Sequence, residues 1–223
     1  MANPIKPTIK TEFFSLALLI LTVAASVFFY NNLPERIVTH WNFAGQADGW
    51  GSGQTQAIFF PLLIVGMYIM FLLIPYLDPR KERYEQFNKV YHIFKNIILA
   101  MMIIVYFLMC LNGLGYNLPI GVIMPALIGL LFIIMGNYMA KLKRNWFVGI
   151  RTPWTMSSEE VWNKTHRVGG KMFILAGLLM LAQIILPNSW KLVVFIIAMV
   201  ILLVGTIGYS YIAYLQEKKK NNF

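Results

Sequence analysis

The chain has 223 residues, of which 58% are hydrophobic and only 13% are charged, and its formal net charge is +10. A water-soluble domain of this length has too little interior to hide so much apolar surface, so the composition excludes an ordinary soluble protein. The single cysteine, Cys110, also excludes a fold held together by disulfides within the chain.

Runs without charged residues mark the expected membrane-spanning segments, because about 17–25 apolar residues cross the roughly 30 Å hydrocarbon core of a bilayer. The first run continues past "AAS" at 24–26 and is longer than a signal-peptide core, so we expect a retained helix. The chain is therefore predicted to be an all-α integral membrane protein, one polytopic membrane domain over residues 1–223. Its six transmembrane helices are expected over residues 13–30, 57–77, 96–116, 119–139, 172–187 and 192–215.

Lysine and arginine are distributed unevenly among the connections between these spans. Two precede the first span, five lie between the second and third, seven lie between the fourth and fifth, and three follow the last. Only Arg36 and Lys191 fall in the remaining connections. Because cytoplasmic segments carry the excess of basic residues, this pattern predicts a multi-pass protein with both termini in the cytoplasm. Orientation and contact with anionic membrane lipids account for the net charge, so direct nucleic-acid binding is not expected.

The connection over residues 33–53 is expected to be a structured loop on the extracytoplasmic side. Its segment "RIVTHW" alternates in the manner of a short strand, whereas "AGQADGWGSGQ" has the composition of a turn. Glycine allows the positive φ angles that such a turn requires, and four glycines are present, at Gly45, Gly49, Gly51 and Gly53.

Three interpretations of this extracytoplasmic loop remain open. It is an interfacial cap if Trp41 and Trp50 lie among the lipid head groups, where indole rings concentrate. It is a recognition surface if its polar groups are arranged to bind something that arrives from outside. It is a metal site if His40, Asp48 and Glu35 converge, although one histidine without a spaced partner is a weak basis for a metal.

The connection over residues 141–171 is expected to be a structured loop on the cytoplasmic side. In "RTPWT", Pro153 keeps Thr152 out of the helical region and predicts an extended turn. In "SSEE", Ser157 and Glu160 have the spacing of a capping box, which predicts the start of a helix.

This helix is expected over about residues 158–168, with its end at the Gly169–Gly170 pair. It either lies in the head-group layer as a basic amphipathic helix or serves as a docking platform for a cytoplasmic protein. One apolar stripe is formed by Val161, Trp162, Thr165 and Val168.

The spans themselves contain few groups that could perform chemistry. All nine acidic residues lie outside them, and no serine or cysteine has an evident base beside it, so we expect neither an enzyme nor a cofactor. Ionisable residues are absent from the span centres, which argues against ion-coupled transport. Gly129, Gly136 and Ala140 share one stripe along the fourth helix and predict close packing with a neighbouring helix.

Two segments of the chain resemble the SdpI family of bacterial membrane proteins. "LPERIVTHWNFAGQADGWGS" is similar to the family's segment with His-Trp-Asn, Gly and Asp-Gly after the first helix. "GNYMAKLKRNWFVGIRTPWTMSSEEVWNKTHRVGGK" is similar to its longer signature around Gly-Ile-Arg-Thr-Pro-Trp-Thr and Thr-His-Arg. Together these segments cover about a quarter of the chain.

The resemblance implies a bacterial cell-membrane protein that confers immunity to a secreted peptide or protein toxin, as family members protect against the SdpC killing factor. It also implies signalling, in which the toxin-engaged protein captures a small DNA-binding autorepressor at the membrane. The alternatives are an orphan membrane receptor or an uncoupled small-molecule transporter of the same fold.

Two sets of site residues follow from these loops, and neither set is catalytic or metal-binding. Arg151 offers a planar five-donor guanidinium that suits a carboxylate or a lipid phosphate. The expected extracytoplasmic recognition residues are His40, Trp41, Asn42, Gly45, Asp48, Gly49 and Trp50. The expected cytoplasmic partner-binding residues are Asn145, Gly149, Arg151, Thr152, Pro153, Trp154, Trp162, Thr165, His166 and Arg167.

Overall fold

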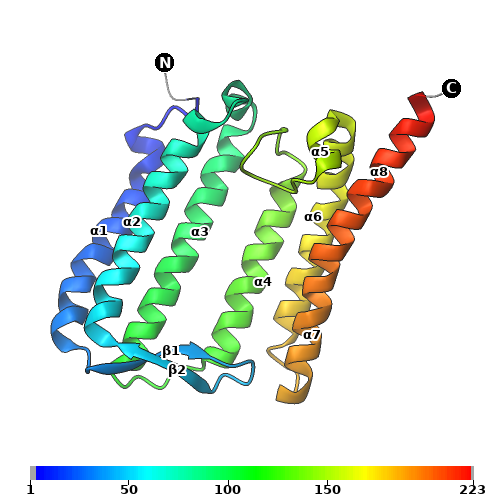
Figure 1. Ribbon diagram of the computed structural model, residues 1–223. Coiled ribbons are helices and arrows are strands. Elements are labelled where there is room, and N and C mark those ends of the chain that lie inside the picture. Colours follow the sequence, from blue (N-terminus) through cyan, green and yellow to red (C-terminus); the bar gives the residue numbers. More distant parts are fainter. Residues whose placement is uncertain (1–3, 222–223) are drawn as a thin grey trace. The chain divides into compact units, whose positions relative to one another are not determined.

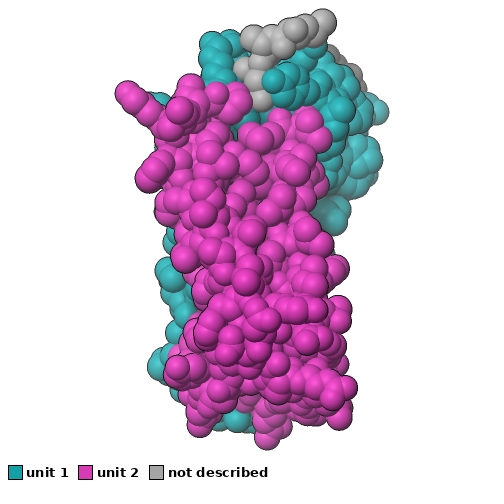
Figure 2. Space-filling model, turned by 90° about the vertical axis from the view of Figure 1, so that its left-hand side faces the viewer, with its two compact units in different colours: residues 1–6, 74–91, 125–223 teal, residues 7–73, 92–124 magenta. Residues whose placement is uncertain are grey.

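A computed structural model describes residues 4–221, and the chain divides into two compact units (Figure 2). Unit 1 combines residues 1–6, 74–91 and 125–223, and unit 2 combines residues 7–73 and 92–124. The elements in chain order (Figure 1) are α1 Ile9–Asn32, β1 Arg36–Trp41, β2 Ala47–Ser52, α2 Gly53–Leu77, a 3-10 turn Lys81–Arg83, α3 Tyr84–Gly113, α4 Ile120–Met139, α5 Pro153–Ser157, α6 Glu159–Ala182, α7 Asn188–Val200, a π-helical turn Ile201–Gly205 and α8 Thr206–Asn221.

The structure has five helical stretches within residues 4–221 that are long and apolar enough to cross a membrane, so the expected count of six is not confirmed. The missing member is the expected span over residues 172–187. The apolar part of α6 begins only after Lys171, and the helix ends at Ala182, which is too short to cross the hydrocarbon core alone. The five stretches are Ile9–Asn32, Gly53–Leu77, Lys81–Gly113, Ile120–Met139 and Asn188–Lys220.

Close backbone contact joins α4 and α6 in unit 1, as Gly129 and Gly136 predicted, whereas Ala140 lies exposed in the turn after α4. A Cβ atom added to Gly170 would lie 2.6 Å from the carbonyl oxygen of Gly136, and one added to Gly177 would lie 2.6 Å from that of Gly129. Side chains at these positions would force the helices apart. The expectation that α6 ends at Gly169–Gly170 is therefore wrong, because these glycines provide a packing surface inside a continuous helix.

The predicted capping box at Ser157 is also wrong, because the chain becomes helical one turn earlier. Thr152 is extended, as predicted, and caps α5 through a reciprocal capping box with Thr155, while Pro153 takes the first helical position. Ser157 consequently lies inside α5, where its hydroxyl donates to the carbonyl oxygen of Trp154 at 2.9 Å. The N-cap of α6 is Ser158, whose side chain accepts from the backbone N–H of Val161.

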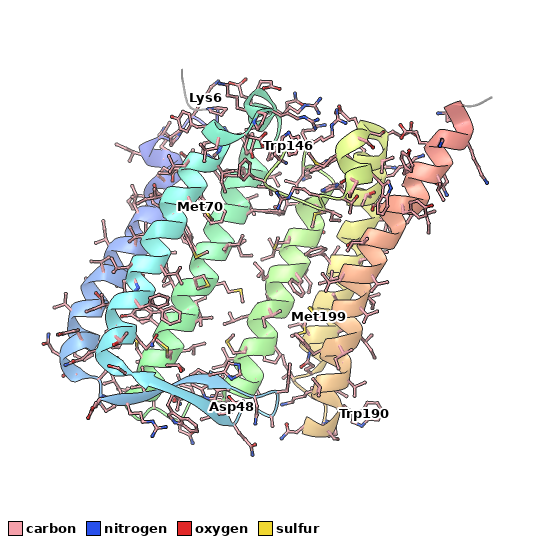
Figure 3. The ribbon with its side chains drawn as sticks, viewed as in Figure 1. Lys6, Asp48, Met70, Trp146, Trp190 and Met199 are labelled. Carbon is pink, nitrogen blue, oxygen red and sulfur yellow. The ribbon has the colours of Figure 1, made fainter. Side chains whose placement is uncertain are left out.

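The core of unit 1 lies where α6 packs against α7 and the π-helical turn. Ala176, Met180, Ala198 and Leu202 are buried together, and Met199 packs against them (Figure 3). The small side chains at 176 and 198 let the two helices approach, and the larger ones fill the remaining space. α6 also lies beside α8, so it is enclosed by neighbours along much of its length (Figure 1).

Unit 2 contains a buried ionic cluster that joins α1, α2 and α3. Lys95 is fully buried and its ammonium group contacts the carboxylate of Glu12. The hydroxyl of Tyr68 donates to the same carboxylate at 2.9 Å, and Nδ1 of His92 lies 3.4 Å from it. Glu12 and Lys95 directly precede the charge-free runs that begin at residues 13 and 96, and both lie inside helices that begin earlier, at Ile9 and Tyr84. The charge-free runs are therefore shorter than the helices that contain them.

The glycine contact between α4 and α6 predicts a specific loss of stability. Gly177→Ala should lower the thermal unfolding temperature, because the new methyl group would overlap the Gly129 carbonyl oxygen and cost on the order of 1–3 kcal/mol. The matched control is Gly208→Ala in α8, where an added Cβ meets no atom within 4 Å. This change should leave the unfolding temperature unchanged or raise it. Equal unfolding temperatures for the two variants would contradict the close packing.

Candidate functional site

The extracytoplasmic loop predicted from the sequence is a β-hairpin in unit 2. β1 confirms the strand expected from "RIVTHW", but Ala47–Ser52 is a second strand and not a turn. Gly49 pairs with His40, and an added Cβ there would lie 2.9 Å from the His40 Cβ. Of the four glycines in this stretch, Gly45 alone has a positive φ, +79°. The glycines mainly provide room for the opposite strand.

Asn42 builds the turn between the two strands. Its side-chain oxygen accepts hydrogen bonds from the backbone N–H groups of Ala44 at 2.9 Å and Gln46 at 3.1 Å. Its backbone N–H donates to the Gln46 carbonyl oxygen at 2.9 Å. This local pattern is the usual way in which an asparagine side chain replaces backbone partners in a turn. The structure therefore assigns Asn42 a shaping role within the hairpin.

His40 and Asp48 form an exposed pair on this hairpin. Nδ1 of His40 lies 2.5 Å from Oδ1 of Asp48, and their side chains are 71% and 43% exposed. The carboxylate orients the imidazole ring, so Nε2 is left for an external partner. Trp50 is half exposed, and the guanidinium of Arg36 lies 5.2 Å from its ring centre. The hairpin thus presents both signs of charge beside an aromatic surface.

The hairpin does not bring a third metal ligand to His40 and Asp48. Within residues 4–221, no group of three histidine, cysteine, aspartate or glutamate side chains is placed to hold a metal ion. Glu35 lies instead in a shallow surface depression beside Arg36 and Trp50.

The hairpin is anchored to the helices of unit 2 by buried contacts. Ile37 is almost fully buried, and a Cβ on Gly113 at the end of α3 would lie 2.8 Å from its side chain. At the turn, an added Cβ on Gly45 would lie 2.8 Å from the Cα atom of Gly121. These contacts restrain the hairpin both near its base and at its turn, so its exposed side chains are held on a fixed support.

A buried histidine organises the second loop, which lies in unit 1. The His166 ring stacks on Trp162 with 3.9 Å between ring centres, and its Nδ1 donates to the Trp162 carbonyl oxygen at 2.8 Å. Nε2 accepts from the backbone N–H of Ile150 at 3.0 Å. This pattern requires a neutral imidazole, and burial lowers the pKa of His166 from 6.5 to about 4. Gly149 has φ +116°, and a Cβ there would lie 2.4 Å from Nε2, so glycine is required.

Asn145 and Asp78 hold the first part of this loop. The buried Asn145 side chain accepts from the backbone N–H groups of Phe147 at 2.9 Å and Val148 at 2.7 Å. Asp78, buried at the end of α2, accepts from the backbone N–H of Trp146 at 2.9 Å. Sequence reasoning missed Asp78, although a single acid at the end of a long apolar run was a usable signal.

The second part of the loop is tied to α8. Thr152 donates to Ser210 at 3.0 Å, and Ser158 donates to Glu217 at 2.6 Å. The ring centres of Trp154 and Tyr211 lie 4.9 Å apart. The loop and the carboxyl-terminal helix therefore form one packed structure.

The structure separates the predicted partner-binding residues into two groups. Those that shape the loop are buried: Asn145, Thr152, Trp162, Thr165 and His166. Those available at the surface are Gly149, Arg151, Pro153 and Arg167, with Trp154 half buried. Arg151 also donates to the Trp146 carbonyl oxygen, so its guanidinium is held in place before any partner binds.

These features define a helical membrane protein with one structured hairpin and one structured loop between its helices. The SdpI/YfhL protein family matches residues 141–210, which include the entire segment around His166. A domain of unknown function, DUF1648, matches residues 17–65 and contains the hairpin. The chain is 25% identical over 203 residues to the immunity protein SdpI of Bacillus subtilis (strain 168), covering 91% of this chain and 95% of that protein. No solved structure matches the chain. The resemblance to the SdpI family is thereby confirmed.

The neutral His166 predicts a stability that depends on pH. Its pKa is 6.5 in an unfolded chain and about 4 in the folded protein. Above about pH 6.5 the residue is neutral in both states and adds no pH dependence. As the pH falls toward 4, the unfolded chain binds the proton first, and the folded protein loses about 3 kcal/mol of stability in total.

Thermal unfolding of the wild type and His166→Gln between pH 4 and 7.5 measures this effect. The unfolding temperature of the wild type should fall more steeply below pH 6.5 than that of the variant. The comparison removes contributions from His40 and His92, which both proteins retain. Parallel pH profiles would show that His166 takes up its proton as readily in the folded protein as in the unfolded chain.

Proposed function

We propose that this protein is an SdpI-like immunity protein that protects its cell from a secreted peptide or protein toxin. The proposal is supported by similarity to the immunity protein SdpI over 91% of the chain. The observation that carries it is the hairpin between two apolar helices, where His40, Asp48, Trp50 and Arg36 present charged and aromatic groups together. Such a mixed surface on a fixed support suits recognition of a polypeptide.

The proposed orientation places the hairpin outside the cell and both termini in the cytoplasm. It is supported by the concentration of lysine and arginine in the other connections. This arrangement requires an even number of crossings, so the part of α6 from Met172 onward, together with residues 183–187, serves as the sixth. Its shortness is tolerated because α4, α7 and α8 cover it, which reduces the surface that meets lipid.

We further propose that the loop of residues 141–171 captures a small DNA-binding repressor when the toxin is engaged. The exposed residues Arg151, Pro153 and Arg167 would meet the partner, with Trp154 at the edge, while the buried residues maintain their positions. Because the Trp146 carbonyl oxygen already holds the Arg151 guanidinium, directional hydrogen bonds to a carboxylate cost little further side-chain entropy. Capture that responds to toxin requires two states of the protein with different affinity for the repressor.

Toxin protection should depend on the exposed face of the hairpin. In cells challenged with the SdpC killing factor, His40→Ala and Trp50→Ala should lower the toxin concentration for half-killing by roughly tenfold at unchanged protein abundance. Asn42→Ala should also reduce protection, because it removes the acceptor that holds the turn. Gln54→Ala changes an exposed residue of the adjoining helix and serves as the control.

Two results would count against this role of the hairpin. If His40→Ala and Trp50→Ala lowered abundance and protection equally, the hairpin would be a structural cap. If Ser52→Cys, in a Cys110→Ala background, resisted an impermeant thiol reagent in intact cells, the exposed hairpin would not face the outside.

Repressor capture should depend on Arg151. With toxin present, a tagged autorepressor of the SdpI system should sediment with wild-type membranes and remain soluble with Arg151→Ala. Arg151→Lys keeps the positive charge but loses the planar guanidinium that can form two parallel hydrogen bonds, so it should capture the repressor only in part. Lys218→Ala removes an exposed cation from α8 and provides the control. Equal recruitment by wild type and Arg151→Ala would exclude the proposed contact.

A further inference from the structure

Three arginines from two separate segments of unit 1 gather beside the start of α6. Arg80 and Arg83 belong to the turn after α2, and Arg144 belongs to the loop after α4. Asp78 joins the two segments, because it accepts from the backbone N–H groups of Arg80 at 2.8 Å and Trp146 at 2.9 Å. We call Arg80, Arg83 and Arg144 the arginine cluster.

The positive charge of the arginine cluster is only partly balanced. The carboxylate of Glu159 lies 3.0 Å from the Arg83 guanidinium, whereas the Arg144 guanidinium donates to the carbonyl oxygen of Met156 at 3.3 Å. Asp78 accepts from uncharged groups, including the hydroxyl of Tyr84 at 2.9 Å. Within residues 4–221, the one ion pair that the cluster makes is therefore that between Arg83 and Glu159.

Two donor groups of the arginine cluster are buried without an acceptor. Nη1 of Arg80 and Nε of Arg144 make no hydrogen bond to the part of the chain between residues 4 and 221. Burial lowers the pKa of Arg144, the nearby charges of Arg80 and Arg83 lower it further, and Glu159 opposes them. Gathering like charges and leaving donors unpaired destabilises a fold unless another group supplies negative charge and acceptor oxygens. This combination is typical of a site for an oxyanion.

Aromatic side chains beside the arginine cluster indicate where that oxyanion comes from. Arg80 lies over Trp146, with 5.8 Å between its guanidinium carbon and the ring centre. Trp146 is 48% exposed and Phe147 is 37% exposed. Tryptophan next to arginine is the combination that lies at the head-group level of a bilayer, with the ring toward the lipid and the charge toward phosphate.

We propose that Arg80, Arg83 and Arg144 form a binding site for the phosphate group of an anionic phospholipid, with Trp146 against the less polar part of the same lipid. A guanidinium binds phosphate through two parallel hydrogen bonds, and the two segments together supply three guanidinium groups for one phosphate. The bound lipid would link the turn after α2 to the loop after α4. The site shares no residue with the hairpin, and it adjoins Arg151, whose guanidinium donates to the carbonyl oxygen of Trp146.

The test is lipid binding by the full-length protein purified in detergent and followed by native mass spectrometry. Phosphatidylglycerol should bind the wild type about tenfold more tightly than phosphatidylcholine does. Arg80→Gln or Arg144→Gln should each weaken phosphatidylglycerol binding by about tenfold, so that the two lipids bind equally. The double variant Lys218→Gln, Lys219→Gln, which removes more charge from α8 of the same unit, should retain the preference. Thermal unfolding of each variant confirms that it is folded, and Arg83→Gln replaces any that is not.

The outcomes distinguish a specific lipid site from non-specific electrostatic attraction between the basic protein and anionic lipid. The proposal would be overturned if the wild type bound the two lipids equally. It would also be overturned if the α8 double variant lost as much affinity for phosphatidylglycerol as the arginine variants do. Competition by millimolar inorganic phosphate is the second arm of the experiment. Displacement of phosphatidylglycerol by phosphate would retain the phosphate site but identify free phosphate as its ligand, whereas resistance to phosphate assigns the site to the lipid.

Discussion

Burial of charged and polar side chains away from water is the constraint on which both units depend. A buried donor or acceptor is costly without a hydrogen-bond partner, and hydrocarbon supplies none. In unit 2, Glu12 and Lys95 meet this requirement by joining helices that are distant in sequence. In unit 1, Asp78 and His166 meet it by binding backbone N–H groups of one loop. The apolar runs form the helices, and these few polar contacts join segments that are distant in sequence.

The two candidate surfaces are built on opposite physical plans. The hairpin has a buried apolar base at Ile37 and an exposed polar face around His40 and Asp48. The second loop buries most of its distinctive side chains and exposes a few, chief among them Arg151. The first plan favours direct contact by many residues, whereas the second favours a rigid shape that presents a small number of groups. A residue-type motif alone does not distinguish these plans, because both contain histidine, tryptophan and asparagine.

The predictions from the sequence were reliable where the signal was a regular pattern over several neighbouring residues, whereas the four-residue capping-box pattern at Ser157 was misleading. Apolar runs and the alternation in "RIVTHW" report the environment of neighbouring residues, and they located the long helices and β1. Glycine was misleading because its role depends on distant partners. Gly49 stands in a strand opposite His40, and Gly170 stands in a helix against Gly136, yet both resemble turn or stop signals in isolation. The burial of His166 likewise depends on Trp162 and Ile150 together, and the Glu12–Lys95 pair joins residues that no short pattern connects.

The continuity of α6 has a mechanical consequence. Its 24 residues make a rod about 36 Å long that begins beside the second loop and passes through Gly169–Gly170 without a break. Its unbroken backbone hydrogen bonds oppose bending, so a displacement of Trp162 is transmitted to Gly177. At Gly170 and Gly177 the backbone of α4 blocks any closer approach, which leaves rotation or sliding along the glycine contact as the accessible motions. A force applied at one end of α6 therefore reaches the other end as a turn or a shift along its axis.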